Sequence, residues 1–297
     1  MRLASQLIAI MAGLFIAHLA AAASPEPQRW VSAGGALTEW IVALGGESRL
    51  VGVDSTSQHP ASVKSLPGIG YQRQLSAEGI LALRPKMLIG TDEMGPPPVI
   101  QQIQAAGVQV EVLSANAALP ALQANLERLG ALMGKEGEAR RLSDQYLQRL
   151  AKEHDRVTQL KRAVPGVLLL VSHAGGAPMV AGAGTVGDWL INQAGGRNLA
   201  THNGYKVFST EAMSGLSPVV LVISDRAQNG VQPREALLRE NPLLGATKAV
   251  RDNRVIEIDP TLLVGGLGPR LPDAVRSLAD AFYPDVAPLS ARVSNTP

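Results

Sequence analysis

The stretch SAEGILALRPKMLI at residues 76–89 returns in degenerate form as STEAMSGLSPVVLV at residues 209–222. Both copies open with Ser-x-Glu, continue to Leu-x-Pro and then run into apolar residues that read as a strand. Two further signatures occur once in each half: a Gly-Tyr pair (Gly70-Tyr71, Gly204-Tyr205) and a glycine-to-tryptophan segment with an acid before the Trp (Gly35 to Trp40, Gly184 to Trp189). Ordered motifs that recur in both halves indicate an internal duplication.

Short apolar runs alternate with helical stretches in each half. Strands are predicted at residues 29–32, 50–53, 87–89 and 108–113, and again at residues 167–171, 179–181, 219–223 and 255–258. Such alternation is typical of a parallel sheet covered by helices on both faces. We therefore expect an α/β protein with two Rossmann-like lobes, residues 24–133 and 163–297, around a ligand cleft.

The segment between the lobes, residues 134–162, is predicted to be a single long linking helix. It is rich in Leu, Ala, Glu, Arg and Lys, its apolar residues follow helical spacing, and the helix should run from about Glu138 to Leu160. Such a helix spans roughly 30 Å, about the diameter of a domain. A rigid connection of this kind favours a small opening and closing of the lobes over a wide hinge motion.

The N-terminus predicts the cellular compartment. Arg2 and the apolar run to Ala23 end in three alanines, followed by a polar segment with two prolines. This order is typical of a cleaved secretory signal peptide, residues 1–23, although a run of about 20 apolar residues could also anchor a protein in a membrane. We expect a periplasmic product.

The composition of the chain argues against some classes of partner and modification. With 27 basic and 25 acidic residues the chain is nearly neutral, which argues against nucleic-acid binding. The chain has no cysteine, so neither a lipid-modified cysteine nor a disulfide framework is expected.

The run Gly182-Ala-Gly184-Thr-Val-Gly187 matches the fingerprint of dinucleotide-binding proteins. Its counterpart in the first half begins at Gly35 and has Thr38 where the third glycine would fall. Because the duplication makes this a recurrent strand-to-helix turn, we interpret the match as a decoy. An exported NAD-dependent oxidoreductase remains the rival from another functional class.

Tyr71 is the sharpest candidate for ligand binding. Two glycines and a proline precede it, which places the phenol on a loop where the lobes face each other. A half-buried structural Tyr is the common alternative for a loop tyrosine. Arg73 favours the ligand hypothesis, because a nearby guanidinium stabilises a phenolate, and phenolate ligation of haem iron is known.

Two residues of the second half are weaker candidates. His173 follows a predicted strand and precedes a Gly-Gly loop, so it could stabilise that loop or contact a ligand. Arg226 follows the strand at residues 219–223 and could pair with a ligand carboxylate or with Asp225.

Glu78 and Glu211 occupy equivalent positions in the repeat. Ser76 and Ser209 precede them as predicted N-caps, and an acid in the first turn of a helix is favourable by itself. Their symmetry also suits two matched basic sites on a dimeric membrane partner.

The two-lobed repeat with its Ser-x-Glu and Leu-x-Pro motifs resembles the substrate-binding proteins of cobalamin, siderophore and haem import systems. Three stretches resemble the haem-binding branch: residues 70–73 (GYQR), residues 172–182 (SHAGGAPMVAG) and residues 268–272 (GPRLP). The resemblance covers nearly all of the chain after the leader.

This resemblance implies a non-enzymatic carrier that acts as a monomer and delivers haem to the permease dimer of an inner-membrane ABC transporter. Tyr71 would be the axial ligand of ferric haem and Arg73 the supporting cation. Arg226 and His173 would assist from the second lobe, and Glu78 and Glu211 would dock on the permease. The alternative within the same family is a ferric siderophore or corrinoid carrier, which would not need Tyr71.

Overall fold

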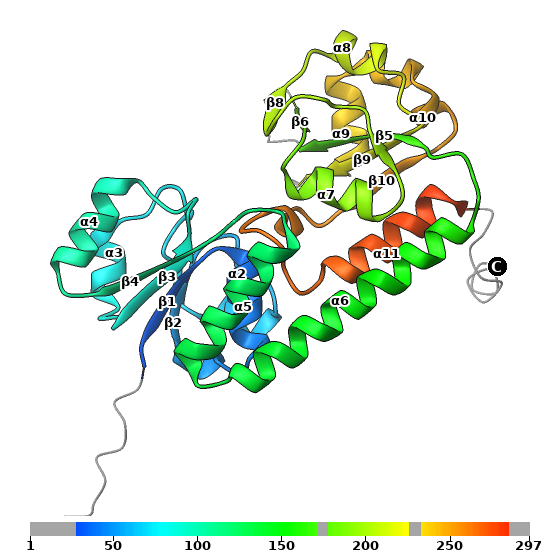
Figure 1. The fold of residues 1–297 in the computed structure, drawn as a ribbon. Helices are drawn as coiled ribbons and strands as arrows, with labels where there is room; N and C mark the ends of the chain where they lie inside the picture. The colour runs from blue at the N-terminus through cyan, green and yellow to red at the C-terminus, as the bar shows by residue number, and fades with distance from the viewer. Residues whose placement is uncertain (1–27, 172–177, 226–232, 285–297) are drawn as a thin grey trace, which may run out of the picture.

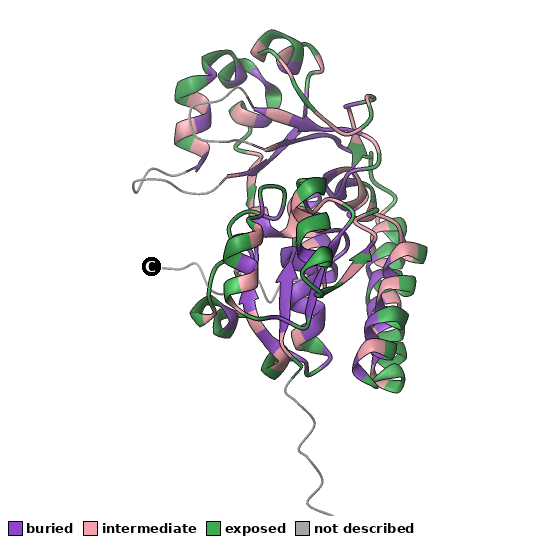
Figure 2. Cartoon of the chain, turned by 90° about the vertical axis from the view of Figure 1, so that its left-hand side faces the viewer, coloured by how far each residue is buried: buried purple, intermediate pink, exposed green. Residues whose placement is uncertain are grey.

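The computed structural model describes residues 28–171, 178–225 and 233–284, so the expected leader lies outside the described residues. The chain forms two α/β lobes, each around its own sheet (Figure 1). Buried residues gather on the strands and on the inner faces of the helices, while the outer helix faces are exposed (Figure 2). No helix in the described part of the chain is long and apolar enough to cross a membrane.

The first sheet is parallel, as expected. Its strands are β1 (Trp30–Ala33), β2 (Leu50–Val53), β3 (Met87–Thr91) and β4 (Gln109–Leu113), in the order β2-β1-β3-β4. Alternate residues of each strand point to opposite faces, so Trp30, Met87 and Ile89 pack with α2 (Gly35–Ala43) and α5 (Leu119–Met133). Val31 and Leu88 pack with α3 (Ala77–Ala82) and α4 (Pro97–Ala105) on the other face.

The second sheet is mixed, which corrects the expectation of a purely parallel one. Strands β9 (Val220–Ser224) and β10 (Val255–Ile258) run parallel to β5 (Gly166–Val171), but β6 (Met179–Ala181) pairs antiparallel with β5, and β8 (Tyr205–Val207) with β6. Only residues 172–178 separate β5 from β6, too few for the crossover helix that a parallel pair requires. The short strand β7 (Arg197–Asn198) pairs with β5.

Helices cover both faces of the second sheet. One face packs on α7 (Val186–Gln193) and α11 (Leu271–Phe282), and the other on α8 (Thr210–Gly215), α9 (Pro233–Glu240) and α10 (Lys248–Arg251). The described residues also form four short 3-10 turns: η1 (Glu47–Arg49), η2 (Ala61–Ser65), η3 (Pro242–Ala246) and η4 (Pro260–Leu263).

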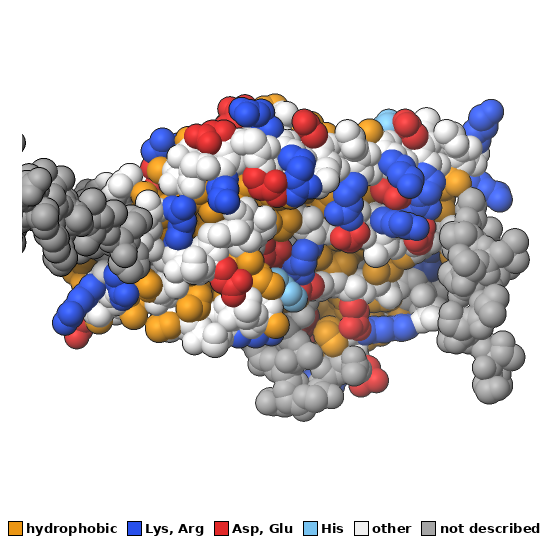
Figure 3. All heavy atoms as spheres, turned by 90° about the horizontal axis from the view of Figure 1, so that it is seen from below, with side chains coloured by type: hydrophobic (Ala, Val, Ile, Leu, Met, Phe, Trp, Pro, Cys, Tyr) orange, Lys and Arg blue, Asp and Glu red, His pale blue; other side chains and the backbone are white. Residues whose placement is uncertain are grey.

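The long helix α6 (Glu136–Gln159) follows α5 in the chain and precedes β5. Its buried residues recur at helical spacing and face α5, α7 and α11: Ala139, Ser143, Tyr146, Leu150 and Glu153. Its outer side carries ion pairs such as Arg141–Glu138, and the face seen from below mixes basic with acidic side chains (Figure 3). One hydrophobic core runs from the first lobe along α6 into the second.

The segment after β10 returns to the first lobe before α11 begins. There the Trp40 indole Nε1 donates to the carbonyl of Leu267 at 2.8 Å, and the Ala36 N–H donates to the carbonyl of Val264. Gly265 and Gly266 have positive φ values and lie against the backbone of the first lobe. Residues of the second half therefore pack directly against helix α2 of the first lobe.

Candidate ligand-binding cleft

The carboxyl ends of the parallel strands in the second sheet border a hollow between the lobes. Its volume is about 620 Å³, and it is lined by Gln58 of the first lobe together with second-lobe residues 225 and 257–261. Asp225 directly follows β9 and Asp259 directly follows β10. Ligands of open α/β sheets bind at this edge, so the hollow lies where the fold class predicts a site.

Tyr71 lies on a loop fastened beside the end of β2. The Ile69 N–H donates to the carbonyl of Val53, the Ser55 N–H donates to the carbonyl of Gly70, and Gly70 has the positive φ of 84° that the turn requires. The Tyr71 side chain is 40% exposed. The loop position predicted for this phenol is therefore observed, although Tyr71 does not line the hollow, which lies nearer to Gln58.

The residues after Tyr71 are tied to the loop that follows β3. Within the described residues, the guanidinium of Arg73 pairs with Glu93, and the other oxygen of Glu93 accepts a hydrogen bond from the buried Gln72 amide at 3.3 Å. The Gly95 N–H donates to the carbonyl of Gln72. The structure thus places Arg73 on Glu93, with half of the arginine side chain still open to solvent.

Tyr205 of β8 is a half-buried tyrosine with a shifted pKa that the sequence did not single out. Burial raises the pKa of Tyr205 to about 12; the charge of Glu93 adds to this rise, and the charge of Arg73 opposes it. The only sequence signal was that its Gly-Tyr pair repeats the pair at Tyr71.

His173 and Arg226 lie outside the described residues. The strands that precede them end side by side, with Val171 of β5 paired to Ser224 of β9. Their proposed contacts with a ligand remain predictions.

The two repeat glutamates lie on short exposed helices, Glu78 on α3 and Glu211 on α8. The predicted N-caps are confirmed: the Ser76 hydroxyl accepts from the Gly79 N–H and the Ser209 hydroxyl from the Ala212 N–H. Hydrogen bonds from its own backbone N–H and from Ser209 lower the pKa of Glu211. Both carboxylates are therefore available at the surface, one on each lobe.

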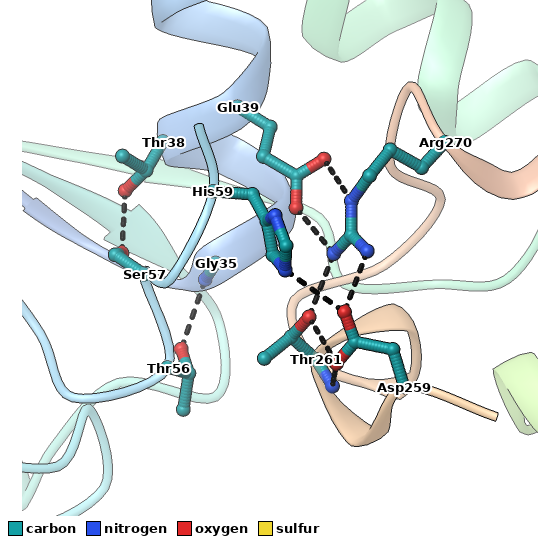
Figure 4. A network of polar contacts seen from close by, with 9 residues as sticks. All are labelled: Gly35, Thr38, Glu39, Thr56, Ser57, His59, Asp259, Thr261 and Arg270. Carbon is teal, nitrogen blue, oxygen red and sulfur yellow. Dashed lines mark hydrogen bonds and ion pairs between the residues drawn. The ribbon is translucent and has the colours of Figure 1, made fainter. Parts of the chain in front are cut away.

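A polar network at the base of the cleft joins the lobes (Figure 4). Arg270 donates from Nε and Nη2 to Glu39 of α2 at 2.9 and 2.7 Å, and from Nη1 to Asp259 at 2.7 Å. His59 of the first lobe lies 2.9 Å from Asp259 through Nε2. Burial opposes ionisation of Asp259, but hydrogen bonds from Thr261 and Arg270 outweigh it and lower the pKa of Asp259.

The glycines of the dinucleotide-like run have packing roles. A Cβ at position 182 would come within 2.1 Å of the His202 carbonyl oxygen, and one at position 187 within 2.7 Å of the Ala181 Cβ. Gly184 has φ +79°. Each glycine is therefore accounted for by the strand-to-helix turn into α7, without a nucleotide.

Several proteins of known structure are similar to this chain in sequence and in fold. A periplasmic haem-binding protein from Pseudomonas aeruginosa is 58% identical, with a TM-score of 0.85 over 87% of this chain and 93% of that one. The periplasmic haem-binding protein RhuT from Roseiflexus sp. RS-1 is 37% identical, with a TM-score of 0.80 over 86% and 98% of the two chains. The haem-binding protein BhuT, solved with two haems, is 36% identical, with a TM-score of 0.76 over 86% and 98%.

The sequence also matches the model of the periplasmic binding proteins over residues 31–262, most of its length. These are substrate-binding proteins without enzymatic activity, so the oxidoreductase alternative is set aside. The chain belongs to the periplasmic binding protein family.

Proposed function

We propose that the chain binds haem in the periplasm and delivers it to the permease of an inner-membrane ABC transporter. The observation that carries this proposal is the 58% identity, over nearly the full described fold, to a periplasmic haem-binding protein. Residues 1–23 serve as the export signal.

Tyr71 ligates the ferric iron of the cargo through its phenolate oxygen. Its support is the exposed phenol on a loop held by backbone hydrogen bonds, a position that allows contact with a ligand without unfolding. Arg73 stabilises the phenolate or pairs with a carboxylate of the cargo, because a guanidinium has five donors and its ion pair with Glu93 leaves some of them available. His173 and Arg226 contribute contacts from the second lobe.

Absorbance during titration with hemin tests this role. The mature protein should develop a Soret band with the features of phenolate ligation, and Tyr71→Phe should lose those features. Tyr283→Phe is the matched control, because the Tyr283 hydroxyl donates to the Gly195 carbonyl and takes no part in the cleft. A colourless protein in excess hemin refutes the haem proposal, and titrations with a corrinoid and a ferric siderophore then test the alternative cargo. An unchanged spectrum in Tyr71→Phe refutes only the ligand assignment.

Docking depends on Glu78 and Glu211, one exposed acid on each lobe. The long helix α6 and the shared core limit how far the two lobes can move apart, so the two acids can meet two basic sites of a permease dimer together. Glu78→Lys with Glu211→Lys should abolish uptake while hemin affinity stays unchanged. Glu127→Lys with Glu235→Lys reverses two other exposed acids and should leave uptake intact. Equal uptake by both double variants refutes the docking assignment.

A further inference from the structure

The network at the base of the cleft has an inner part that is rigid. Arg270 holds Glu39 through two parallel hydrogen bonds, and the Glu39 side chain is only 7% exposed. The same guanidinium donates to Asp259 and to the Thr261 hydroxyl, at 2.7 and 2.6 Å. A fork-to-fork pair of this kind fixes both the distance and the orientation of its partners. It therefore joins α2 of the first lobe to the end of β10 in the second.

Asp259 provides a second contact between the two lobes, beside the pair of Glu39 and Arg270. Its Oδ1 accepts from the backbone N–H and the hydroxyl of Thr261, which orients the carboxylate at the start of η4. Its Oδ2 lies 2.7 Å from Arg270 of its own lobe and 2.9 Å from His59 of the first lobe.

The contact from His59 is the outer part of the network. The side chains of His59 and Asp259 are 40% and 33% exposed, and the neighbouring Gln58 lines the hollow between the lobes. An exposed contact contributes little to the free energy of folding, so it can break without unfolding the protein. Breaking the buried pair of Glu39 and Arg270 would instead destabilise the fold strongly. The network thus combines a fixed joint with a releasable contact at the edge of the hollow.

We propose that Glu39, Arg270 and Asp259 form a joint that sets the separation of the lobes, and that His59 is a positioning residue whose contact with Asp259 holds the cleft at the width seen in this structure. Opening begins with loss of the His59–Asp259 contact and turns about the Arg270 joint, which remains closed. No cargo is needed for this device, because every contact is made within the chain.

Distances between the lobes test the proposal in the cargo-free protein. The chain has no cysteine, so spin labels at Gln104→Cys in α4 and Glu240→Cys in α9 report one distance between exposed positions on opposite lobes. His59→Ala should shift this distance distribution to longer values and broaden it, with an unchanged circular dichroism spectrum. His59→Gln, whose amide can still donate to Asp259, should restore a narrow distribution.

Asp273→Asn is the matched control, because it removes an ion pair with Arg149 between α6 and α11 without touching the network. An unchanged distribution in His59→Ala, or an equal shift in Asp273→Asn, overturns the proposal. If the protein binds hemin, transfer of hemin to apomyoglobin should also be faster in His59→Ala by up to about fivefold, the ratio equivalent to an exposed contact of about 1 kcal/mol. Failure to bind hemin would refute the proposed function but leave the distance test intact.

Discussion

Replacing Arg270 by methionine should destabilise the protein far more than removal of a surface charge. The arginine makes four hydrogen bonds, two to Glu39 and one each to Asp259 and Thr261. Methionine keeps much of the packing volume but leaves the carboxylate of Glu39, 7% exposed, without its cation. Removing one partner of a buried pair costs about 3–5 kcal/mol, and since Arg270 itself is 29% exposed we expect about 3 kcal/mol.

Urea unfolding followed by circular dichroism and tryptophan fluorescence measures this loss. Trp40 donates to the Leu267 carbonyl three residues before Arg270, so its emission reports the same region. Arg149→Met is the control, since it removes an exposed pair with Asp273 and should cost less than about 1 kcal/mol.

Glu39→Gln added to Arg270→Met should recover part of the lost stability, because the second substitution removes the unpaired charge. A loss in Arg270→Met no larger than that in Arg149→Met would refute the reasoning. So would strictly additive effects of Arg270→Met and Glu39→Gln, because additivity would mean that the two side chains do not interact.

Three further outcomes are expected from the same structure. The lowered pKa of Asp259 means that its ionised form stabilises the fold above its ordinary value of 3.8, and that this stabilisation is lost as the pH falls through the lower folded value. In acid-unfolding curves, Asp259→Asn should therefore be less stable than the parent at pH 7 and approach the stability of the parent as the pH falls below 3.8. Burial raises the pKa of Tyr205 from 10.0 to about 12, so the stability of the parent should fall as the pH rises between these values. The stability of Tyr205→Phe should fall less over the same range. Absorbance near 295 nm reports phenolate formation. Gly182→Ala should lower the free energy of unfolding, measured in urea, by about 2 kcal/mol, because the added Cβ would lie 2.1 Å from the His202 carbonyl oxygen. Gly215→Ala is the control and should not destabilise the protein, because a Cβ there meets open space.

The parts of the fold that the sequence predicted are those with local causes. Each strand read from an apolar run is present within one or two residues, and the helix predicted from Glu138 to Leu160 runs from Glu136 to Gln159. The second sheet was described incorrectly because the direction of β6 depends on how it pairs with β5, a relation that hydrophobic periodicity does not encode. Strand β8 was not predicted at all, since three residues with one Lys give no periodic signal.

In the candidate site, too, the sequence predicted the features with local causes and missed those that depend on distant residues. The loop position of Tyr71 and the N-caps before Glu78 and Glu211 follow from residues within a few positions of each. The pair between Glu39 and Arg270 joins residues 231 positions apart, and no local pattern could connect them. Its two ends were nevertheless visible separately, as the acid before Trp40 and as the Gly-Pro-Arg stretch near the C-terminus.

The duplication itself explains why this joint exists only once among the described residues. Glu39 and Asp188 stand at matched positions before a tryptophan, but Asp188 accepts a hydrogen bond from Asn198 within its own lobe at 2.8 Å. The crossing segment that carries Arg270 follows the last strand of the second sheet and returns to α2 of the first. Only the first copy of the acid can therefore meet it. The repeat produces two similar lobes, whereas the contact that sets their separation involves a segment that only the second half has. Substitutions at the two matched acids should therefore differ in effect. Glu39→Gln should alter the lobe-to-lobe distance, and Asp188→Asn should not.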